Sequence, residues 1–461
     1  MLETASLVTL KYFDKDGRFI PKALGDELIQ ENKVLTVNDT SEIFVFNGRF
    51  YESGEKILET QSATKLDHKF KKASMADTMA YIRAMTYRNR KDNALPENLL
   101  PIENGLLDIH TREITPHTPD YFYTSLHPLH YDPEAKCPKI DAFLGQVLLP
   151  EDVQIGVELF AYVLVRSVPN PFEKTVMLYG TGGNGKGTFL NLLTEFLGEQ
   201  NVSSVPLHAL CSGNLFFSSQ LYGKMANVCA DLPPRALLDS AEFKKITTGD
   251  PITAQSKFQE PFSFRPYAKM LYSANQMPAT KDYSEAFFDR WLVLPFPNKW
   301  RVAGKKDSKK IKKISSKEEL SGLLNKALDV LPALLERAEF TTTASTKNSR
   351  REYLLRADVC TIYLEECLEP GPGSTIKKDD LYEKFVDFTE EQGEEKPPLR
   401  DVFFQRLRRA YPRAKAVRLA ADENKKRPWA FEGVKLKESD ENKTGENKPP
   451  LSPAQKQLLD A

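Results

Sequence analysis

The chain of 461 residues lacks any apolar run close to the ~20 residues that a membrane-spanning helix needs. Its start, "MLETASLVTLKYFDKDGRF", also lacks the basic region and long apolar core of a secretory signal. Both absences argue against a membrane or secreted protein. We therefore expect a cytoplasmic protein with no membrane partner.

Cysteine is scarce. The five cysteines are scattered and form no CxxC pair, which suits reduced thiols rather than a disulfide framework. His127, His130 and Cys137 lie near one another in sequence, but a zinc site needs a fourth ligand and none is present nearby. Packing in a Pro-rich stretch explains these three residues better than a metal does.

An excess of one charge is absent, with 64 basic and 64 acidic residues. This balance excludes a uniformly basic nucleic-acid coat but leaves room for a local basic patch. Two stretches are such candidates. Residues 301–317 hold eight Lys or Arg and one Asp, and residues 400–427 hold ten basic residues and three acids. The first fits a solvated linker as well as it fits a nucleic-acid contact.

Length predicts about three domains at ~150 residues each, and no internal repeat appears. Within 173–300, "KTVMLYG", "KMANVCAD", "AKMLYSAN" and "RWLVLPF" predict strands, and "GTFLNLLTEFLG" predicts a helix. This alternation indicates an α/β core with a parallel sheet. The expected segments are a small α+β domain (1–100), a helical and irregular domain (101–172), the α/β core (173–300), a basic linker with a helical extension (301–355), a small C-terminal unit (373–434) and a disordered tail (435–461).

A phosphate-binding loop is the strongest motif. Gly180, four further residues, Gly185 and Lys186 satisfy G-x-x-x-x-G-K between a predicted strand and a predicted helix. Glycines let backbone N–H groups point at phosphate oxygens, and the helix adds its positive end. We expect ATP to bind along Gly180, Thr181, Gly182, Gly183, Asn184, Gly185, Lys186, Gly187 and Thr188.

Gly187 departs from the motif, because a magnesium-binding Ser or Thr normally follows the lysine. The metal must then gain a water or use Thr188. The same GKGT form occurs in adenylate-kinase-type enzymes, so a nucleotide kinase remains an alternative.

Asp231 ends the strand "KMANVCAD", about 45 residues after Lys186, where a carboxylate can hold Mg²⁺. Related ATPases often carry a second acid directly afterwards, but Leu232 occupies that position. Asp239 and Glu242 are the remaining candidates for activating water.

Residues 242–278 add three more elements. "TTGDP" and "EPFSFRP" bracket a predicted hairpin whose tip includes Lys257, and Asn275 ends an apolar strand where its amide can hold a water near the γ-phosphate. Arg290 then leads into another strand and can stabilise the transition state, often across a subunit boundary. Each residue also fits a plain turn or surface ion pair, but their order and spacing together favour a motor.

In these motifs the sequence resembles the superfamily 3 helicases, in the virus and plasmid primase-helicase branch. The resemblance rests on "ENGLLDIHTREITPHTPDYFYT", "LYGTGGNGKGTFLNLL", "YGKMANVCADLP", "FKKITTGDPI", "FRPYAKMLYSANQMP" and "FFDRWLVLPFP", and covers about two-thirds of the chain. It implies an AAA+-like ATPase core that forms a ring, usually a hexamer, and moves 3′ to 5′ on single-stranded DNA inside a host cell. Further expected partners are forked DNA and a primase or polymerase.

The resemblance also implies residue roles. Lys186 matches the phosphate-binding lysine, Asp231 the Mg²⁺ acid and Asn275 the polar sensor. Arg290 matches the arginine finger, and Lys257 the hairpin lysine that faces DNA. Lys244 and Asp250 fall in a motif peculiar to the superfamily.

The C-terminal unit resembles a winged helix, with two helices and a β-wing. Its predicted helix 399–411 would bury Leu399, Val402, Phe403 and Leu407. Contacts to DNA phosphates are expected from Arg406, Arg408, Arg409, Lys425, Lys426 and Arg427.

Two alternatives stay open beside the helicase. A nucleotide kinase needs an acceptor site and an arginine-rich lid, and neither is visible in the sequence. A weakly catalytic origin-binding protein would account for the incomplete metal site. Residues 1–100 show no primase active site, so a free-standing helicase and a piece of a longer protein both fit.

Overall fold

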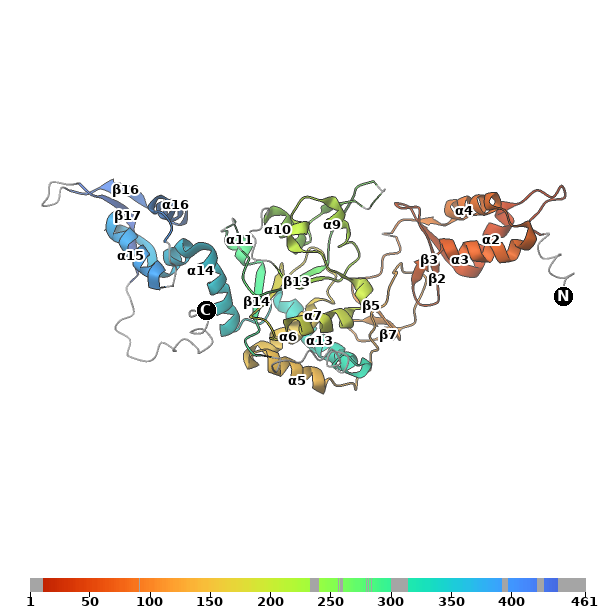
Figure 1. Ribbon diagram of the computed structural model, residues 1–461, viewed down its shortest axis with the longest axis horizontal. Coiled ribbons are helices and arrows are strands. Elements are labelled where there is room, and N and C mark those ends of the chain that lie inside the picture. Colours follow the sequence, from red (N-terminus) through yellow and green to blue (C-terminus); the bar gives the residue numbers. More distant parts are fainter. Residues whose placement is uncertain are drawn as a thin grey trace. The chain divides into compact units, whose positions relative to one another are not determined.

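A computed structural model of the chain describes residues 11–90, 92–232, 240–255, 257, 260–278, 280, 282, 284–299, 314–391, 397–420 and 427–437. The chain forms two compact units, Met1–Arg350 and Arg351–Ala461 (Figure 1). None of the helices in the described part is both long enough and apolar enough to cross a bilayer.

The N-terminal part of the first unit is a small α+β fold, in agreement with the sequence. Its elements are α2 (Pro21–Asn32), β1 (Val34–Val37), β2 (Ile43–Phe46), β3 (Tyr51–Ser53), α3 (Glu55–Leu66), η1 (Asp67–Lys69), α4 (Lys72–Thr86) and β4 (Tyr87–Arg88). The strands form one sheet in the order β3-β2-β1-β4. Apolar side chains of the three helices, such as Leu28, Leu58 and Ile82, pack with Ile43 and Val45 of the sheet.

The next segment joins the main core rather than forming a domain of its own. It contains the antiparallel strands β5 (Leu99–Ile102), β6 (Gly105–Asp108) and β7 (Ile114–Thr115), then α5 (Pro138–Val147), η2 (Pro150–Asp152) and α6 (Val153–Tyr162). His127 is buried, and burial together with Arg166 lowers its pKa to about 3, so the ring is neutral at pH 7. Among the described residues, no group of three or more His, Cys, Asp or Glu is placed to hold a metal.

The central sheet has five parallel strands, which confirms the parallel α/β prediction. They are β8 (Thr175–Tyr179), β9 (Val202–Ser203), β10 (Ala226–Cys229), β13 (Lys269–Ala274) and β14 (Trp291–Pro295), in the order β14-β8-β13-β10-β9. Tyr179 lies opposite Ala274 on one side and Pro295 on the other. The carboxyl ends of these three strands are therefore level.

Helices cover the two faces of this sheet. Alternate strand residues such as Val176, Leu271 and Leu294 belong to one core with α5, α6, α7 (Lys186–Leu197) and α13 (Lys317–Arg337). On the other face, Trp291 stacks on Phe243 of α10 (Ser240–Thr248), with 5.1 Å between ring centroids. Shorter elements complete this unit, namely η3 (Glu199–Asn201), α8 (Leu207–Leu210), α9 (Leu215–Ser219), the hairpin β11 (Ile252–Ala254) and β12 (Phe262–Phe264), and α11 (Glu285–Phe288).

Helix α13 closes the core from a distant part of the sequence. The Glu319 carboxylate accepts hydrogen bonds from the backbone N–H of Lys139 (3.0 Å) and Ile140 (3.2 Å), in the first turn of α5. Gly322 lies so close to the loop before α5 that a Cβ would sit 2.2 Å from the carbonyl carbon of Lys136. Residues after the sheet therefore complete the packing of residues before it.

The second unit contains helix α14 (Ala344–Cys367) from residue 351 on, β15 (Leu368–Lys377), α15 (Lys378–Glu391), α16 (Arg400–Ala410), β16 (Lys415–Arg418) and β17 (Trp429–Leu436). Its sheet is antiparallel, in the order β15-β17-β16. Phe385 and Phe403 stack at 4.2 Å in the centre of its core. The two predicted helices are present as α15 and α16, and β16 and β17 form an antiparallel pair after them.

Two predictions for this unit were wrong. Leu399 and Val402 are 76% and 40% exposed, whereas Phe404 is 5% exposed and packs against Phe431. The buried stripe of α16 is thus Phe403, Phe404 and Leu407, because the aromatic core lies on that side. Residues 435 and 436, which the sequence assigned to the tail, belong to β17, and residues 438–461 lie outside the described residues.

Candidate nucleotide-binding site

The phosphate loop joins β8 to α7 at the carboxyl edge of the sheet. Gly180, Gly183 and Gly185 have φ values of 154°, 86° and 94°, which side-chain-bearing residues rarely adopt. A Cβ on Gly180 would lie 2.6 Å from the carbonyl oxygen of Phe296, and one on Gly185 would lie 2.6 Å from Cγ1 of Val147. Steric contacts and positive φ values therefore both require glycine at positions 180 and 185.

Lys186 is the first residue of α7 and is 7% exposed. Its Nζ donates hydrogen bonds to the carbonyl oxygens of Gly180 and Thr181, so the ammonium is held against the loop. Burial lowers the pKa of Lys186, and the Asp231 carboxylate opposes that shift. A buried cation beside glycine N–H groups and a helix N-terminus is chemically suited to a phosphate chain.

Asp231 follows β10 and has a φ of 66°, an unusual conformation that Asp and Asn adopt more readily than most residues. Its backbone N–H donates to Oγ of Ser273 at 3.3 Å, and the next N–H, of Leu232, donates to the Ser273 carbonyl at 2.7 Å. These bonds tie the turn to β13, while Asp231 itself is exposed. Asp231 can therefore meet a ligand without first breaking a core contact.

Asn275 directly follows β13, the strand between β8 and β10. Because parallel strands end at one edge, Asn275 lies between the phosphate loop and the turn that carries Asp231. It is exposed at this edge. The fold thus brings together three predicted site residues, Lys186, Asp231 and Asn275, which are up to 89 positions apart in sequence.

Gly187 and Thr188 lie in the first turn of α7. Gly187 is exposed, and a Cβ there would meet nothing within 4 Å. Space therefore does not explain the glycine at this position. Thr188 is half-buried and is the nearest hydroxyl after Lys186 in the helix.

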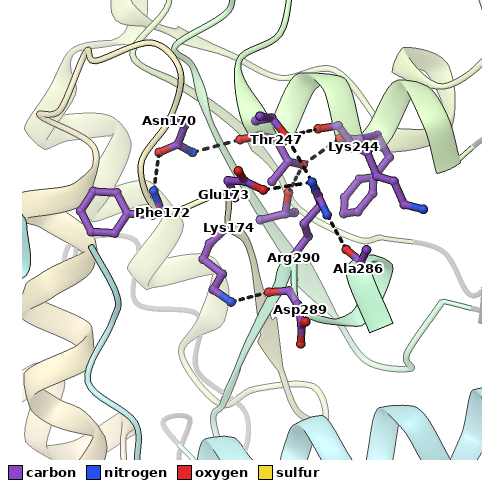
Figure 2. Close-up of polar contacts among 12 residues, drawn as sticks. Asn170, Phe172, Glu173, Lys174, Lys244, Thr247, Ala286, Asp289 and Arg290 are labelled. Atoms are coloured by element: carbon purple, nitrogen blue, oxygen red, sulfur yellow. Dashed lines mark hydrogen bonds and ion pairs between the residues drawn. The ribbon is translucent and has the colours of Figure 1, made fainter. Parts of the chain in front are cut away.

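Arg290 lies at the opposite edge of the sheet, directly before β14 (Figure 2). Its guanidinium donates to the Ala286 carbonyl at 2.6 Å and to Thr248 Oγ1 at 3.3 Å, and it pairs with Glu173 at 3.0 Å. A five-residue strand spans about 16 Å at ~3.3 Å per residue, so Arg290 is remote from the phosphate loop of its own chain.

Lys244 of α10 is also held within its own subunit. Its Nζ lies 2.6 Å from the Asp282 carboxylate and 3.2 Å from Ser284 Oγ. Burial alone would raise the pKa of Asp282, but hydrogen bonds from Lys244 and Ser284 outweigh burial and hold that pKa far below its usual range. Asp250 follows the end of α10, where its N–H donates to the Lys245 carbonyl at 2.9 Å. Lys257 is exposed in the turn between β11 and β12.

Family models and viral proteins match parts of this chain. Residues 15–149 match a family model described as "D5 N terminal like", and residues 178–290 match one described as "Family of unknown function (DUF5906)". The chain is 27% identical over 230 residues to "Putative helicase L207/L206" of Acanthamoeba polyphaga mimivirus. It is 22% identical over 242 residues to "Putative helicase 022R" of Frog virus 3 (isolate Goorha). The chain resembles viral helicase-like proteins.

The two matches each cover 48% of this chain but only 24% and 25% of the relatives' own lengths. Among solved structures, the A form apo structure of the NrS-1 C terminal region has a TM-score of 0.50 at 12% identity, covering 89% of this chain and 98% of that one. A second apo structure of that region also gives 0.50, at 13% identity, covering 91% and 100%. These structures show a shared fold.

The basic residues predicted to bind DNA in the second unit are in different surroundings. Arg406 is mostly buried and lies 3.6 Å from the Asp358 carboxylate, whereas Arg408 and Arg409 are exposed on α16. Arg427 is exposed, and its Nε donates to the Leu419 carbonyl. Lys425 and Lys426, like Asp239 in the first unit, lie outside the described residues.

Sequence reasoning missed the buried polar cluster at the amino edge of the sheet. Lys269 opens β13 and is 1% exposed, with its Nζ 3.4 Å from Asn170 Oδ1 and 5.0 Å from the centre of the Tyr162 ring. Asn170 also donates to Tyr162 Oη. It donates to the Thr247 carbonyl as well, as Figure 2 shows. In the sequence this cluster appears only as a single lysine before an apolar run. Lysine at that position is typical of a strand that begins at the protein surface, so the pattern gives no sign of burial.

Proposed function

We propose that the chain is an ATP-dependent DNA helicase of the superfamily 3 type, with an AAA+-like core. It assembles as a ring, with six subunits expected, and moves 3′ to 5′ on single-stranded DNA to unwind duplex during replication of a virus or plasmid. The meeting of Lys186, Asp231 and Asn275 at one edge of the parallel sheet supports this proposal most strongly. The similarity to viral helicase-like proteins supports the choice of a motor.

The site residues divide the work on ATP. The loop N–H groups and the α7 N-terminus hold the phosphates, and Lys186 neutralises charge that develops on the γ-phosphate. Asp231 and Thr188 are the residues that would hold Mg²⁺, which when bound neutralises phosphate charge. Asn275 orients the attacking water from the central strand.

Assembly into a ring gives Arg290 a role that its own subunit does not offer. A head-to-tail interface that closes on itself places the amino edge of one subunit near the nucleotide of the next. Arg290 must then exchange its contacts with Glu173 and Thr248 for the neighbour's phosphates. Lys257, in the β11–β12 hairpin, is the expected DNA contact in the channel, and hairpin movement with the ATP state carries the strand.

The second unit is proposed to be a winged helix that adds DNA contacts of its own. Its exposed cations Arg408, Arg409 and Arg427 are in keeping with this role. Forked DNA and a primase or polymerase are the partners expected for such a protein at a replication fork inside the host cell.

DNA-stimulated ATP turnover tests the proposal. Wild-type protein should hydrolyse ATP with Mg²⁺, faster when single-stranded DNA is added, and should unwind a fork with a 3′ tail but not one with a 5′ tail. Lys186→Ala should abolish both activities. Lys56→Ala, on the exposed side of α3, is a matched lysine control that should change neither.

Folded protein without ATP turnover would sink the helicase proposal. Turnover that depends on an added nucleoside monophosphate would establish a kinase instead. Particle symmetry seen by electron microscopy, with and without an ATP analogue, tests the ring separately.

A further inference from the structure

The second unit carries four cations that are held over aromatic rings. The Lys378 Nζ lies 5.6, 5.1 and 4.9 Å from the ring centroids of Phe404, Trp429 and Phe431. Arg418 lies 4.5 Å from Trp429, Arg400 lies 5.4 Å from Phe404, and Arg408 lies 5.9 Å from Phe431. We name this set of seven residues the cationic aromatic face.

Strand register explains why these residues meet. Arg418 pairs with Trp429 across β16 and β17, and paired residues in an antiparallel sheet share one face. Phe431, two positions beyond Trp429, is on that same face and packs against Phe404 of α16. Arg400, Phe404 and Arg408 are spaced four apart on α16, so they form one stripe along the helix.

Three of the four cations of this face contact aromatic rings and have no acidic partner among the described residues. Among the described residues, Lys378, Arg408 and Arg418 make no ion pair with a carboxylate, and Arg400 contacts Asp379. Arg406 and Lys435 of the same unit, by contrast, are paired with Asp358 and Glu369. Burial lowers the pKa of Lys378, and the nearby charges of Arg408 and Arg400 lower it further. A polyanion would relieve this repulsion.

Trp429 adds a surface that phosphate binding alone does not need. Its side chain is 45% exposed at the start of β17, although two cations lie against the indole. Exposed aromatic rings among cations suit a strand whose bases are accessible for stacking, since every base offers a π-face. The bases of a closed duplex are already stacked on one another.

We infer that the cationic aromatic face binds single-stranded DNA, with phosphates at Lys378, Arg408 and Arg418 and a base against Trp429. The inference rests on the proposed function for the choice of DNA over RNA. It differs from the sequence-based prediction, which included Arg406 and did not include Lys378 or Arg418.

Binding of a labelled dT₂₀ oligonucleotide to the full chain without nucleotide, followed by fluorescence anisotropy, tests the face directly. Trp429→Ala should weaken binding about tenfold, and Trp429→Phe should keep most of it. Lys378→Ala and Arg418→Ala should each weaken binding and reduce the slope of log K against log salt by about 0.7. Unchanged affinity in all three alanine variants, with thermal melts like wild type, overturns the inference.

The chain offers matched control lysines close to the residues of this face. Lys377 is the neighbour of Lys378 and Lys415 lies three positions before Arg418, and both are exposed on the opposite face of the sheet. Lys377→Ala and Lys415→Ala should change affinity less than about twofold, because each removes one charge from the unit without touching the face. Losses equal to those of Lys378→Ala and Arg418→Ala would show a nonspecific charge effect and contradict the proposed face.

Photo-crosslinking locates the base contact. An oligonucleotide with 5-iodouracil should crosslink to the peptide that contains Trp429, and a hairpin duplex of equal charge should compete poorly. Crosslinks confined to the first unit, or tighter binding of the duplex, would overturn the inference. Neither readout uses ATP, so the face can be confirmed while DNA-stimulated turnover fails, and the reverse outcome is equally distinguishable.

Discussion

The two edges of the central sheet hold lysines in opposite circumstances. At the carboxyl edge, Lys186 donates hydrogen bonds to loop carbonyls, next to the exposed Asp231 and Asn275. At the amino edge, Lys269 is buried in contact with Asn170 and the Tyr162 ring. One lysine faces a place where a ligand can enter, whereas the other is enclosed by protein. The comparison teaches that a polar residue beside an apolar strand gains its role from the edge on which the fold places it.

Arg290 offers the largest test of this comparison, because an arginine finger at the amino edge would give that edge a part in ATP hydrolysis too. We expect Arg290→Ala to lower ATP turnover about 1,000-fold, the smaller end of the effect of losing such an arginine. Mixing Arg290→Ala with Lys186→Ala subunits should restore part of the activity, since some boundaries then join an intact Lys186 to an intact Arg290.

The control for the mixing experiment is each variant alone at the same total concentration. Thermal melts show whether losing the Glu173 and Thr248 contacts simply destabilises the fold. A stable variant with lost turnover and no recovery on mixing would assign Arg290 to its own subunit.

Asp231→Asn tests the carboxyl edge with the next largest effect. Asparagine tolerates the positive φ of this position, so the turn should survive while the charge is lost. We expect turnover to fall at least about 100-fold, because several kcal/mol of charge stabilisation disappear. The free energy of unfolding should change by less than about 0.5 kcal/mol, as for other exposed positions. Denaturant titration and steady-state turnover measure both, and normal turnover in the variant would exclude Asp231 from the metal site.

Lys269→Met tests the amino edge through stability. Burial lowers the pKa of Lys269 to about 7, while Glu97 opposes the shift, against 10.5 for an ordinary lysine. Between these values the unfolded chain binds a proton that the folded chain lacks, so wild-type stability rises with pH in this window. Below about pH 7 the buried charge exerts its full destabilising effect.

Methionine removes that charge at similar volume. We expect Lys269→Met to be more stable than wild type by about 1–4 kcal/mol near pH 6, with the difference shrinking toward pH 10. Urea titrations at several pH values measure this, with Lys56→Met as an exposed control. A difference that does not vary with pH would mean that Lys269 titrates normally.

Gly187→Ser should have the smallest effect. Open space around a Cβ at this position admits the serine without strain, and its hydroxyl can enter the metal shell. We expect a lower magnesium requirement, about two- to fivefold, with unchanged stability. A magnesium titration of turnover is the measurement. No change would show that Thr188 or a water already completes the shell.

Much of the carboxyl edge could be predicted from sequence. Apolar runs that end in a glycine loop, Asp231 or Asn275 are local signals, and parallel strands bring their ends together by geometry alone. The order of the strands supplied what the sequence could not. Placing β13 between β8 and β10 makes Asn275 a neighbour of both the loop and Asp231.

The remaining features depend on tertiary contacts, which leave no local pattern in the sequence. Lys269 is buried because Tyr162 and Asn170, about 100 positions earlier, cover it. The stripe of α16 was misjudged because its sequence is apolar at five of the positions 399–407, and only the aromatic core decides which ones face inward. The cationic aromatic face likewise joins residues from four separate elements.

The cap that α13 places on α5 has a practical consequence for exchanging modules between proteins. The motif-bearing stretch 178–290 is the part that a family comparison recognises, yet it does not contain the helix that seals its own core. A transplant cut at those boundaries would omit α5, α6 and α13, and would expose the buried leucines of α7 that share a core with these helices. The segment that can be transferred to another protein with its core intact therefore extends from β5 to the end of α13.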